Sequence, residues 1–104
     1  MKEKPLHQNV TFKIKENPIL AIVNSGAAVS IITNRLRKKL GLKIDELSQI
    51  MVTIANGTRQ RALGEINSVG IAIQTLLVPM KLWVIEFIDK TLLLGTDFLD
   101  KTEA

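Results

Sequence analysis

Hydrophobic and polar positions alternate along much of the chain, and a few short runs are wholly apolar. Residues 9–15 alternate, as in a half-buried strand. Residues 19–23 are continuously apolar, which is typical of a strand buried on both faces. Asn17-Pro18 predicts a tight turn between these two segments. A further β-type run covers residues 29–33, so the first third of the chain is expected to be mainly β-structure.

A short helix is expected next. Thr33 or Asn34 can cap its N-terminus, and the helix is predicted to run to Leu40. Gly41 follows and can adopt the left-handed conformation that ends many helices. Residues 42–47 are predicted to be a linking segment.

The second half of the chain returns to the β pattern. Asn56-Gly57 is a strong hairpin signal between two arms of β character. Gly64 suggests a bulge or a close approach of backbone. Strands are predicted over residues 50–55, 59–69, 70–75, 81–87 and 92–94, and a helical turn over residues 95–99. The pattern therefore predicts one mainly β domain with two short helices.

Composition narrows the possible chemistry. The 104 residues, 46% of them hydrophobic, fit one folded domain and exclude a disordered tail. The chain has no Cys and a single His, His7, so thiolate nucleophiles, disulfides and clustered metal ligands are not expected. No apolar run is long enough for a membrane span, and no signal segment is evident. We therefore expect no cofactor, no metal, no membrane association and a cytoplasmic protein, or one within a virus-like particle.

The formal net charge is +4, and the basic residues are densest around the predicted helix. Two interpretations are a solvated helix face and a phosphate-binding surface. No aromatic residues interleave the cluster, which favours the solvated face, and no nucleic-acid partner is expected. The cluster comprises Arg35, Arg37, Lys38, Lys39 and Lys43.

A polar loop, Asn24-Ser25-Gly26-Ala27, interrupts two apolar strands. Buried loop backbone is costly unless its donors and acceptors are paired, so this loop is the main functional candidate. With Asp at position 24, residues 20–32 resemble the active-site segment of the retropepsin family, the aspartic proteases of retroviruses and gypsy-type retrotransposons. Residues 52–58, followed by Leu63-Gly64, are similar to the family's flap hairpin. Residues 92–99 resemble its closing strand, glycine and helix, so the resemblance spans roughly residues 9–101.

The resemblance implies an all-β, retropepsin-like closed β-barrel-like fold with one or two short helices, assembled as a symmetric homodimer. Residues 1–104 would form a single domain, with residues 1–8 as a flexible or dimer-forming terminal segment. Position 24 would carry the catalytic carboxylate, the Ser25 hydroxyl would bond across the dimer axis, and Gly26 would allow substrate to approach the backbone. The residues implied to contact substrate are Ala27, Ala55, Asn56, Gly57, Thr58, Leu92 and Leu93.

The chain departs from the family at the catalytic position, where residue 24 is Asn. A carboxamide cannot share a proton as paired carboxylates do, so this form is expected to bind peptide without cutting it. Three explanations of Asn24 remain open. It is a substitution introduced to abolish activity, the chain is a natural pseudoprotease, or Asn24 is a structural loop residue and the resemblance to the family is mistaken.

The resulting hypothesis is a homodimeric aspartic endopeptidase that processes peptide or polyprotein substrates, here in an inactive form. A form with Asp at position 24 would bind pepstatin-type inhibitors. The alternative is a non-catalytic domain for dimerisation or peptide binding. Asp97, the other acid within a motif, is expected to have a structural role near the start of the last helix.

Overall fold

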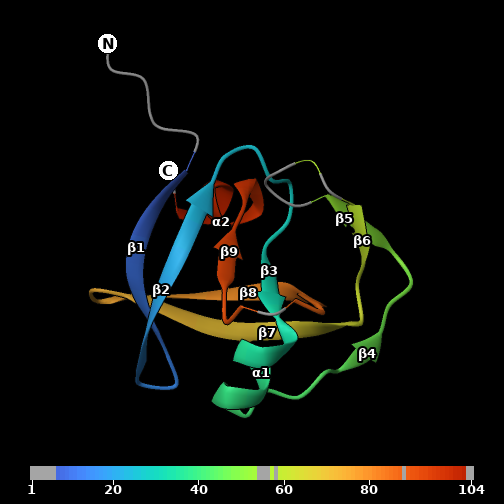
Figure 1. The fold of residues 1–104 in the computed structure, drawn as a ribbon. Helices are drawn as coiled ribbons and strands as arrows, with labels where there is room; N and C mark the ends of the chain where they lie inside the picture. The colour runs from blue at the N-terminus through green and yellow to red at the C-terminus, as the bar shows by residue number, and fades with distance from the viewer. Residues whose placement is uncertain (1–6, 54–56, 58, 88, 103–104) are drawn as a thin grey trace.

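The computed structural model of the chain describes residues 7–53, 57, 59–87 and 89–102. Within these residues the chain forms nine strands and two helices (Figure 1). In chain order they are β1 (His7–Ile14), β2 (Asn17–Asn24), β3 (Ile31–Thr33), α1 (Asn34–Leu40), β4 (Glu46–Leu47), β5 (Met51–Thr53), β6 (Arg59–Arg61), β7 (Gly64–Ile73), β8 (Leu76–Ile85), β9 (Leu92–Leu94) and α2 (Thr96–Thr102).

The main sheet closes on itself. Its strands follow the order β1-β2-β9-β3-β8-β7-β4, and β1 also pairs with β7 through Lys13 and Ala72. Among the described strands, six therefore form a closed barrel, and the short β4 is attached to its outside through β7. β5 and β6 form a separate antiparallel hairpin. The predicted closed, mainly β fold with two short helices is confirmed.

The first turn lies earlier than predicted. Lys15 and Glu16 form it with positive φ angles of 51° and 69°, whereas Asn17 and Pro18 already belong to β2. Asn17 closes the turn from its far end, because its Nδ2 donates to the carbonyl oxygens of Ile14 and Lys15 at 3.3 and 3.1 Å. The turn predicted at Asn17-Pro18 is therefore wrong by two residues.

The long β7–β8 hairpin also differs from the prediction. Its turn lies at residues 74–75, where Gln74 has a φ of 55°, and β8 continues through Pro79 to Ile85. Pro79 is tolerated because β8 pairs with β3 only from Trp83 onward, so at Pro79 one side of the strand has no ladder to interrupt. The close approach predicted at Gly64 is present, since a Cβ there would lie 2.4 Å from Ile44 Cγ2.

The first helix begins and ends as its sequence predicts. Thr33 is the N-cap, and its Oγ1 accepts a hydrogen bond from the backbone N–H of Leu36 at 3.4 Å. Gly41 is left-handed with a φ of 71°, and its N–H donates to the carbonyl of Lys38. Leu36 and Leu40 are buried, which turns the remaining residues of α1 toward solvent.

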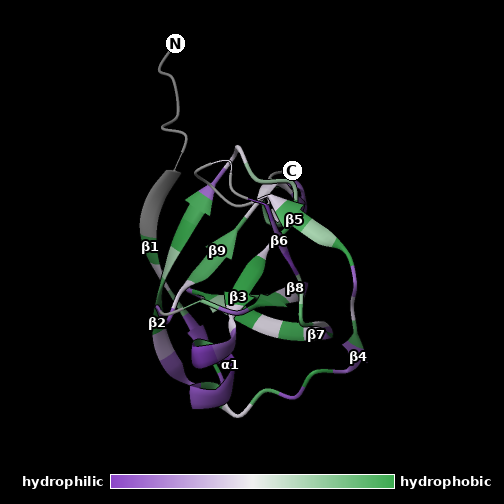
Figure 2. Cartoon of the chain, turned by 45° about the vertical axis from the view of Figure 1, so that its right-hand side comes forward, coloured by the Kyte–Doolittle hydropathy of each residue, from purple (hydrophilic) through white to green (hydrophobic). Residues whose placement is uncertain are grey.

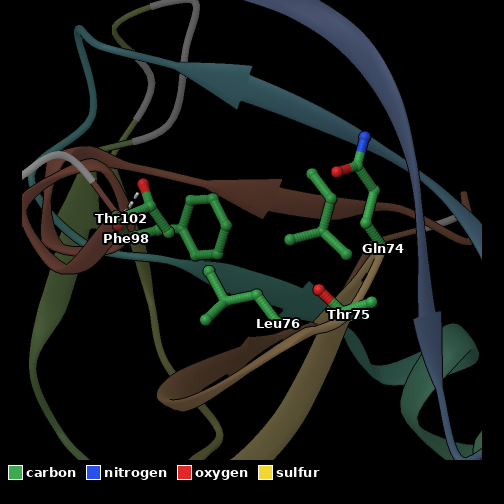
Figure 3. Close-up of a pocket in the computed structure, with 6 residues that line it drawn as sticks. Gln74, Thr75, Leu76, Phe98 and Thr102 are labelled. Carbon is green, nitrogen blue, oxygen red and sulfur yellow. Dashed lines mark hydrogen bonds between the residues drawn. The ribbon is translucent and has the colours of Figure 1, made fainter.

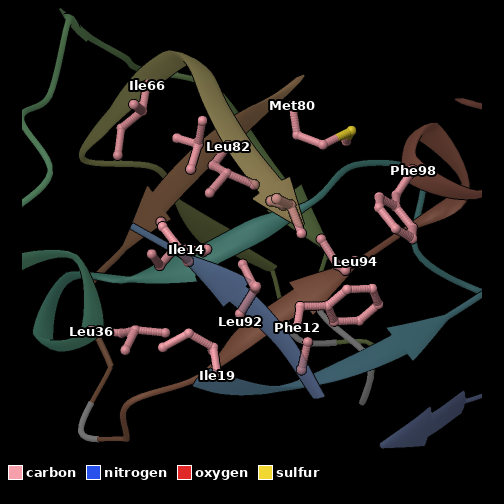
Figure 4. Packing of buried hydrophobic residues seen from close by; sticks show 14 of the residues in the cluster. Phe12, Ile14, Ile19, Leu36, Ile66, Met80, Leu82, Leu92, Leu94 and Phe98 are labelled. Carbon is pink, nitrogen blue, oxygen red and sulfur yellow. The ribbon is translucent and has the colours of Figure 1, made fainter. Parts of the chain in front are cut away.

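The main hydrophobic core fills the barrel (Figure 4). Phe12 of β1 and Phe98 of α2 meet edge to face, with ring centroids 5.5 Å apart, so the last helix is packed onto the first strand. A second, smaller cluster comprises Ala27, Ile31, Val52, Ile85 and Leu93, with Val29 and Trp83 packed against it. No helix among the described residues is long and apolar enough to cross a membrane.

An ion pair braces β7 against β8 on the outside of the barrel. Lys81 Nζ lies 2.6 Å from Glu65 Oε1 and 5.0 Å from the centroid of the Trp83 ring. The Lys81 ammonium lowers the pKa of Glu65, and the Ser48 hydroxyl lowers it further. The folded state therefore favours the charged form of Glu65.

Replacing a core side chain is the first test of this packing. Leu94 is fully buried in the main core, and we expect Leu94→Ala to lower the free energy of unfolding by about 2–5 kcal/mol. The control is Leu77→Ala, because Leu77 is exposed and its loss should cost less than about 0.5 kcal/mol. Urea unfolding at a fixed protein concentration measures both, and equal effects would contradict the assigned core.

The Glu65–Lys81 pair makes stability depend on pH. Because the folded-state pKa of Glu65 is below its ordinary value of 4.5, its contribution is present above that value and is lost as the pH falls through the folded pKa. Glu65→Gln should therefore destabilise the chain more at pH 7 than at a strongly acid pH below the folded-state pKa of Glu65, where the protonated Glu resembles Gln. Unfolding at both pH values measures this, with Glu16→Gln, at an exposed turn position, as control. A pH-independent effect of Glu65→Gln would count against the assignment.

Candidate active site

The loop predicted to carry the chemistry crosses the end of β9. β9 lies between β2 and β3 in the sheet, and residues 25–30 connect these two strands (Figure 1). Asn24, the last residue of β2, is only 6% exposed. Its Oδ1 accepts a hydrogen bond of 2.8 Å from the backbone N–H of Gly26, and its backbone carbonyl accepts one of 3.1 Å from Ala27. The side chain at position 24 is therefore held in one orientation by its own loop.

Ser25 and Gly26 are exposed beside Asn24. A Cβ added to Gly26 would lie 3.1 Å from Asn24 Oδ1, which is tighter than an ordinary contact. A larger residue at position 26 would therefore push against the side chain that this loop orients. The roles predicted for the Ser25 hydroxyl, across a dimer axis, and for Gly26, beside substrate, stay predictions.

Residues 95–97, which follow β9, support the loop through hydrogen bonds. The Ala27 carbonyl accepts a hydrogen bond of 2.7 Å from the backbone N–H of Thr96. Gly95 makes this contact possible, because a Cβ there would lie 2.5 Å from the Ala27 oxygen and 2.7 Å from the Val29 oxygen. The backbone N–H of Gly95 also donates to Ser30 Oγ at 3.1 Å. The loop thus obtains hydrogen-bond partners from a segment about 70 residues later in the chain.

Asp97 completes this support. Its Oδ2 accepts from the backbone N–H of Ser30 at 3.1 Å, and its Oδ1 accepts from Ser30 Oγ at 2.7 Å and from the N–H of Phe98 at 2.8 Å. Asp97 therefore binds a backbone N–H in the first turn of α2 and holds the loop at the same time, in agreement with its predicted structural role. Its partner Ser30 was missed, since no local signal links residues 67 positions apart.

An apolar surface lies next to the loop. We call the second hydrophobic cluster, Ala27, Ile31, Val52, Ile85 and Leu93, the apolar floor. It brings together two residues predicted to contact substrate, Ala27 and Leu93, and Leu93 retains 8% exposure. Leu92 has no exposed surface and packs in the main core, because successive side chains of a strand point to opposite faces. The structure therefore separates Leu92 from the other candidates.

The hairpin of β5 and β6 covers one side of the apolar floor. Its predicted pairing is confirmed, with Val52 opposite Gln60, and Val52 packs into the floor. Gln60 Nε2 donates to the carbonyl oxygen of Glu86, which joins the hairpin to the end of β8. Gly57, near the tip, has a φ of 85°, a conformation that favours glycine. The other predicted tip residues, Ala55, Asn56 and Thr58, lie outside the described residues.

A separate cavity of about 300 Å³ lies between the β7–β8 turn and α2 (Figure 3). It shares no lining residue with the loop or the apolar floor, and none of its lining side chains is ionisable, so it cannot supply an acid or a base. Its lining residues are Ile73, Gln74, Thr75, Leu76, Phe98 and Thr102. Among the described residues, no group of three or more His, Cys, Asp or Glu side chains is arranged to hold a metal.

Comparison with known proteins identifies the architecture. A model of the family described as "gag-polyprotein putative aspartyl protease" matches residues 10–101. The retroviral protease-like domain of Ddi1 from Leishmania major is similar at 26% identity and a TM-score of 0.72, covering 94% of this chain and 78% of that one. No curated protein sequence matches the chain.

Two further solved structures share the fold. The EIAV protease, complexed with the inhibitor HBY-793, gives 17% identity and a TM-score of 0.75 over 94% of this chain and 89% of that one. A retropepsin-like aspartic protease from Rickettsia conorii gives 22% identity and a TM-score of 0.71 over 94% of this chain and 74% of that one. The retropepsin-like resemblance and fold expected from the sequence are confirmed.

The support beneath the loop can be tested through Asp97. Asp97→Ala leaves the backbone N–H and the buried hydroxyl of Ser30 without their acceptor, so we expect a loss of about 1–3 kcal/mol in unfolding free energy. Amide hydrogen exchange should also accelerate at residues 27–30. Asp100→Ala removes the same charge from an exposed position of α2 and serves as the control. Equal stability and equal exchange rates in the two variants would contradict the role assigned to the Ser30–Asp97 hydrogen bonds.

Proposed function

Because this chain belongs to the aspartyl protease family of gag polyproteins, we propose that it is a retropepsin-type endopeptidase domain held in an inactive form by Asn24. The observation that carries the proposal is the orientation of the side chain at position 24. Its Oδ1 accepts the N–H of Gly26 in a loop that residues 95–97 support through hydrogen bonds. A carboxylate could accept the same hydrogen bond, so an Asp would fit this position without rearranging the loop.

One chain supplies only one such group, which is why a homodimer is part of the proposal. Two carboxylates about 3 Å apart cannot both ionise, so a pair shares one proton and acts as base and acid together. The base would take a proton from water as the oxygen attacks the peptide carbonyl, and the acid would protonate the leaving amine. In such a dimer the hydroxyl of Ser25, which is exposed beside Asn24, would bond between the two loops.

Substrate would lie as an extended peptide along the apolar floor. Extended peptides pair through main-chain hydrogen bonds and place alternate side chains in pockets. Ile31, Val52 and Leu93 form a buried aliphatic cluster that includes Ala27 of the loop, and this cluster would suit apolar side chains flanking the cleaved bond once a peptide gains access to it. The β5–β6 hairpin, already packed on the floor through Val52, is suited to fold over such a peptide and exclude water.

With Asn24 in both copies, neither a base nor an acid is available at this position. Carboxamides do not titrate at neutral or mildly acid pH, so binding would persist while hydrolysis is lost. A domain kept for dimerisation or peptide binding is the second candidate function, and Asn24 itself is the observation that favours it. The two candidates make opposite predictions for an Asp at this position.

The decisive variant is Asn24→Asp. We expect it to cleave extended peptides at mildly acid pH, with inhibition by pepstatin, whereas the unmodified chain and Asn24→Ala remain inert. General acid–base groups typically contribute about 10²–10⁴-fold each, so the gain should be large against background. Fluorogenic peptide assays from pH 4 to 7 measure the rate, and we expect it to fall as the pH rises above the range in which the pair shares a proton.

Sedimentation velocity and circular dichroism on the same samples establish that each variant is folded and dimeric. A folded, dimeric Asn24→Asp variant without pepstatin-sensitive cleavage would overturn the endopeptidase proposal. Peptide binding by that inert dimer, measured by titration calorimetry, would then support the non-catalytic alternative.

A further inference from the structure

We propose that the end of the molecule formed by α1 and the β1–β2 turn binds the phosphate backbone of a nucleic acid. The proposal concerns a different surface from the loop at Asn24 and does not depend on peptidase activity. We call it the basic surface, and it comprises Lys15, Arg35, Lys38, Lys39 and Lys43. In Figures 1 and 2 it lies at the lower end of the molecule, opposite the β2–β3 loop, and α1 is strongly hydrophilic.

The helix gathers three of these residues on one face. Arg35, Lys38 and Lys39 are spaced i, i+3 and i+4, so their side chains are neighbours on the outer side of α1. All three are exposed, while Leu36 and Leu40 fix the opposite side of the helix in the core. The orientation of the basic face is therefore set by the packing of the helix.

A second segment joins this end. Lys15 Nζ lies 3.4 Å from the carbonyl oxygen of Gly41 at the end of α1, so the β1–β2 turn is next to the helix terminus. Together, residues 13–16 and 34–45 contain seven basic and two acidic residues. Since the whole chain has a net charge of +4, this end carries all of the net positive charge. Such asymmetry attracts polyanions toward one end of a protein.

The charges are also unneutralised. Arg37, the remaining base of α1, is engaged, since its Nε donates to Asn34 Oδ1 at 2.7 Å and its guanidinium donates to the Leu42 carbonyl at 2.9 Å. By contrast, no hydrogen bond or ion pair within the described part of the chain involves the side chains of Arg35, Lys38, Lys39 and Lys43.

The acids flanking the basic surface have other partners. Glu86 Oε1 accepts from Asn34 Nδ2 at the opposite end of α1, and Asp45 Oδ2 accepts from the backbone of Asn67. Glu16, beside Lys15, is exposed and offsets one of the basic charges. The four free cations are therefore available to an external anion.

The composition of the basic surface favours nucleic acid over a membrane. Peripheral membrane surfaces combine basic residues with exposed apolar side chains that enter the lipid. Here the large exposed hydrophobic residues lie outside residues 13–16 and 34–45: they are Leu20, Leu47, Ile50, Met51, Leu63, Leu76, Leu77 and Phe87. The surface also has no aromatic residue for base stacking, so binding would be to phosphates and independent of sequence.

The sequence alone favoured a solvated helix face. The structure adds two observations. Lys15, from another segment, lies next to the end of α1. Within the described residues, the side chains of Arg35, Lys38, Lys39 and Lys43 have no acidic partner. These two observations favour a phosphate-binding surface over a solvated helix face. A solvated face does not require that basic residues from two segments of the chain lie together.

The test is the salt dependence of binding to a 20-nucleotide single-stranded RNA, followed by fluorescence anisotropy. Each phosphate contact lowers log K by about 0.7 per unit of log salt, so three to five contacts predict a slope of about −2 to −3.5. The triple variant Arg35→Gln, Lys38→Gln, Lys39→Gln should bind at least about tenfold more weakly, with a slope reduced by about 2.

The matched control removes three positive charges elsewhere, with Arg59→Gln, Arg61→Gln and Lys90→Gln. It has the same net charge, and we expect its affinity to change less than about threefold because only long-range attraction is reduced. A second control, Arg35→Lys with Lys38→Arg and Lys39→Arg, keeps the charges and should keep the binding. Circular dichroism establishes that each variant is folded.

Three results would overturn the proposal. The first is an affinity that does not fall with salt, and the second is equal weakening in both triple variants, which would indicate net charge alone. The third is binding to vesicles containing anionic phosphatidylserine without binding to RNA, which would assign the basic surface to a membrane.

Discussion

The structure depends on hydrogen-bond partners for a polar loop placed between two buried strands. Residues 24–30 cross the end of β9, where water cannot form hydrogen bonds with every backbone N–H and C=O group. Gly95, Thr96 and Asp97 supply those partners, and Gly95 lacks the Cβ that would collide with the Ala27 and Val29 carbonyls. The last elements of the chain therefore build the support for a candidate site near its beginning.

Local signals in the sequence predicted the parts of the fold that depend on neighbours in the chain. Thr33 and Gly41 mark the ends of α1, and the polar loop at Asn24 identifies the candidate site. A competing signal misplaced the first turn, because Asn17-Pro18 is compatible with a strand that lacks a partner on one side. The hydrogen bonds between Ser30 and Asp97 depend on tertiary contacts, and so does the placing of Leu92 and Leu93 in different hydrophobic clusters. Local sequence patterns do not encode such contacts.

Asn24 preserves the hydrogen bonding of the loop but lacks the acid–base chemistry of a carboxylate. Its Oδ1 makes the hydrogen bond that a carboxylate could make, so an Asp could take the same place in the loop. The carboxamide removes the charge and the exchangeable proton on which paired carboxylates depend. The proposed nucleic-acid contact lies at the opposite end of the molecule, so peptide and polyanion would not compete for the same surface.

The most direct test of the account is a crystal structure of the chain with a bound extended peptide. We expect a twofold dimer in which the two Asn24 side chains are neighbours across the axis. The peptide would lie between the β5–β6 hairpin and the floor residues Ile31 and Leu93. A monomer with the peptide bound elsewhere, or a dimer that keeps the two Asn24 loops apart, would contradict it.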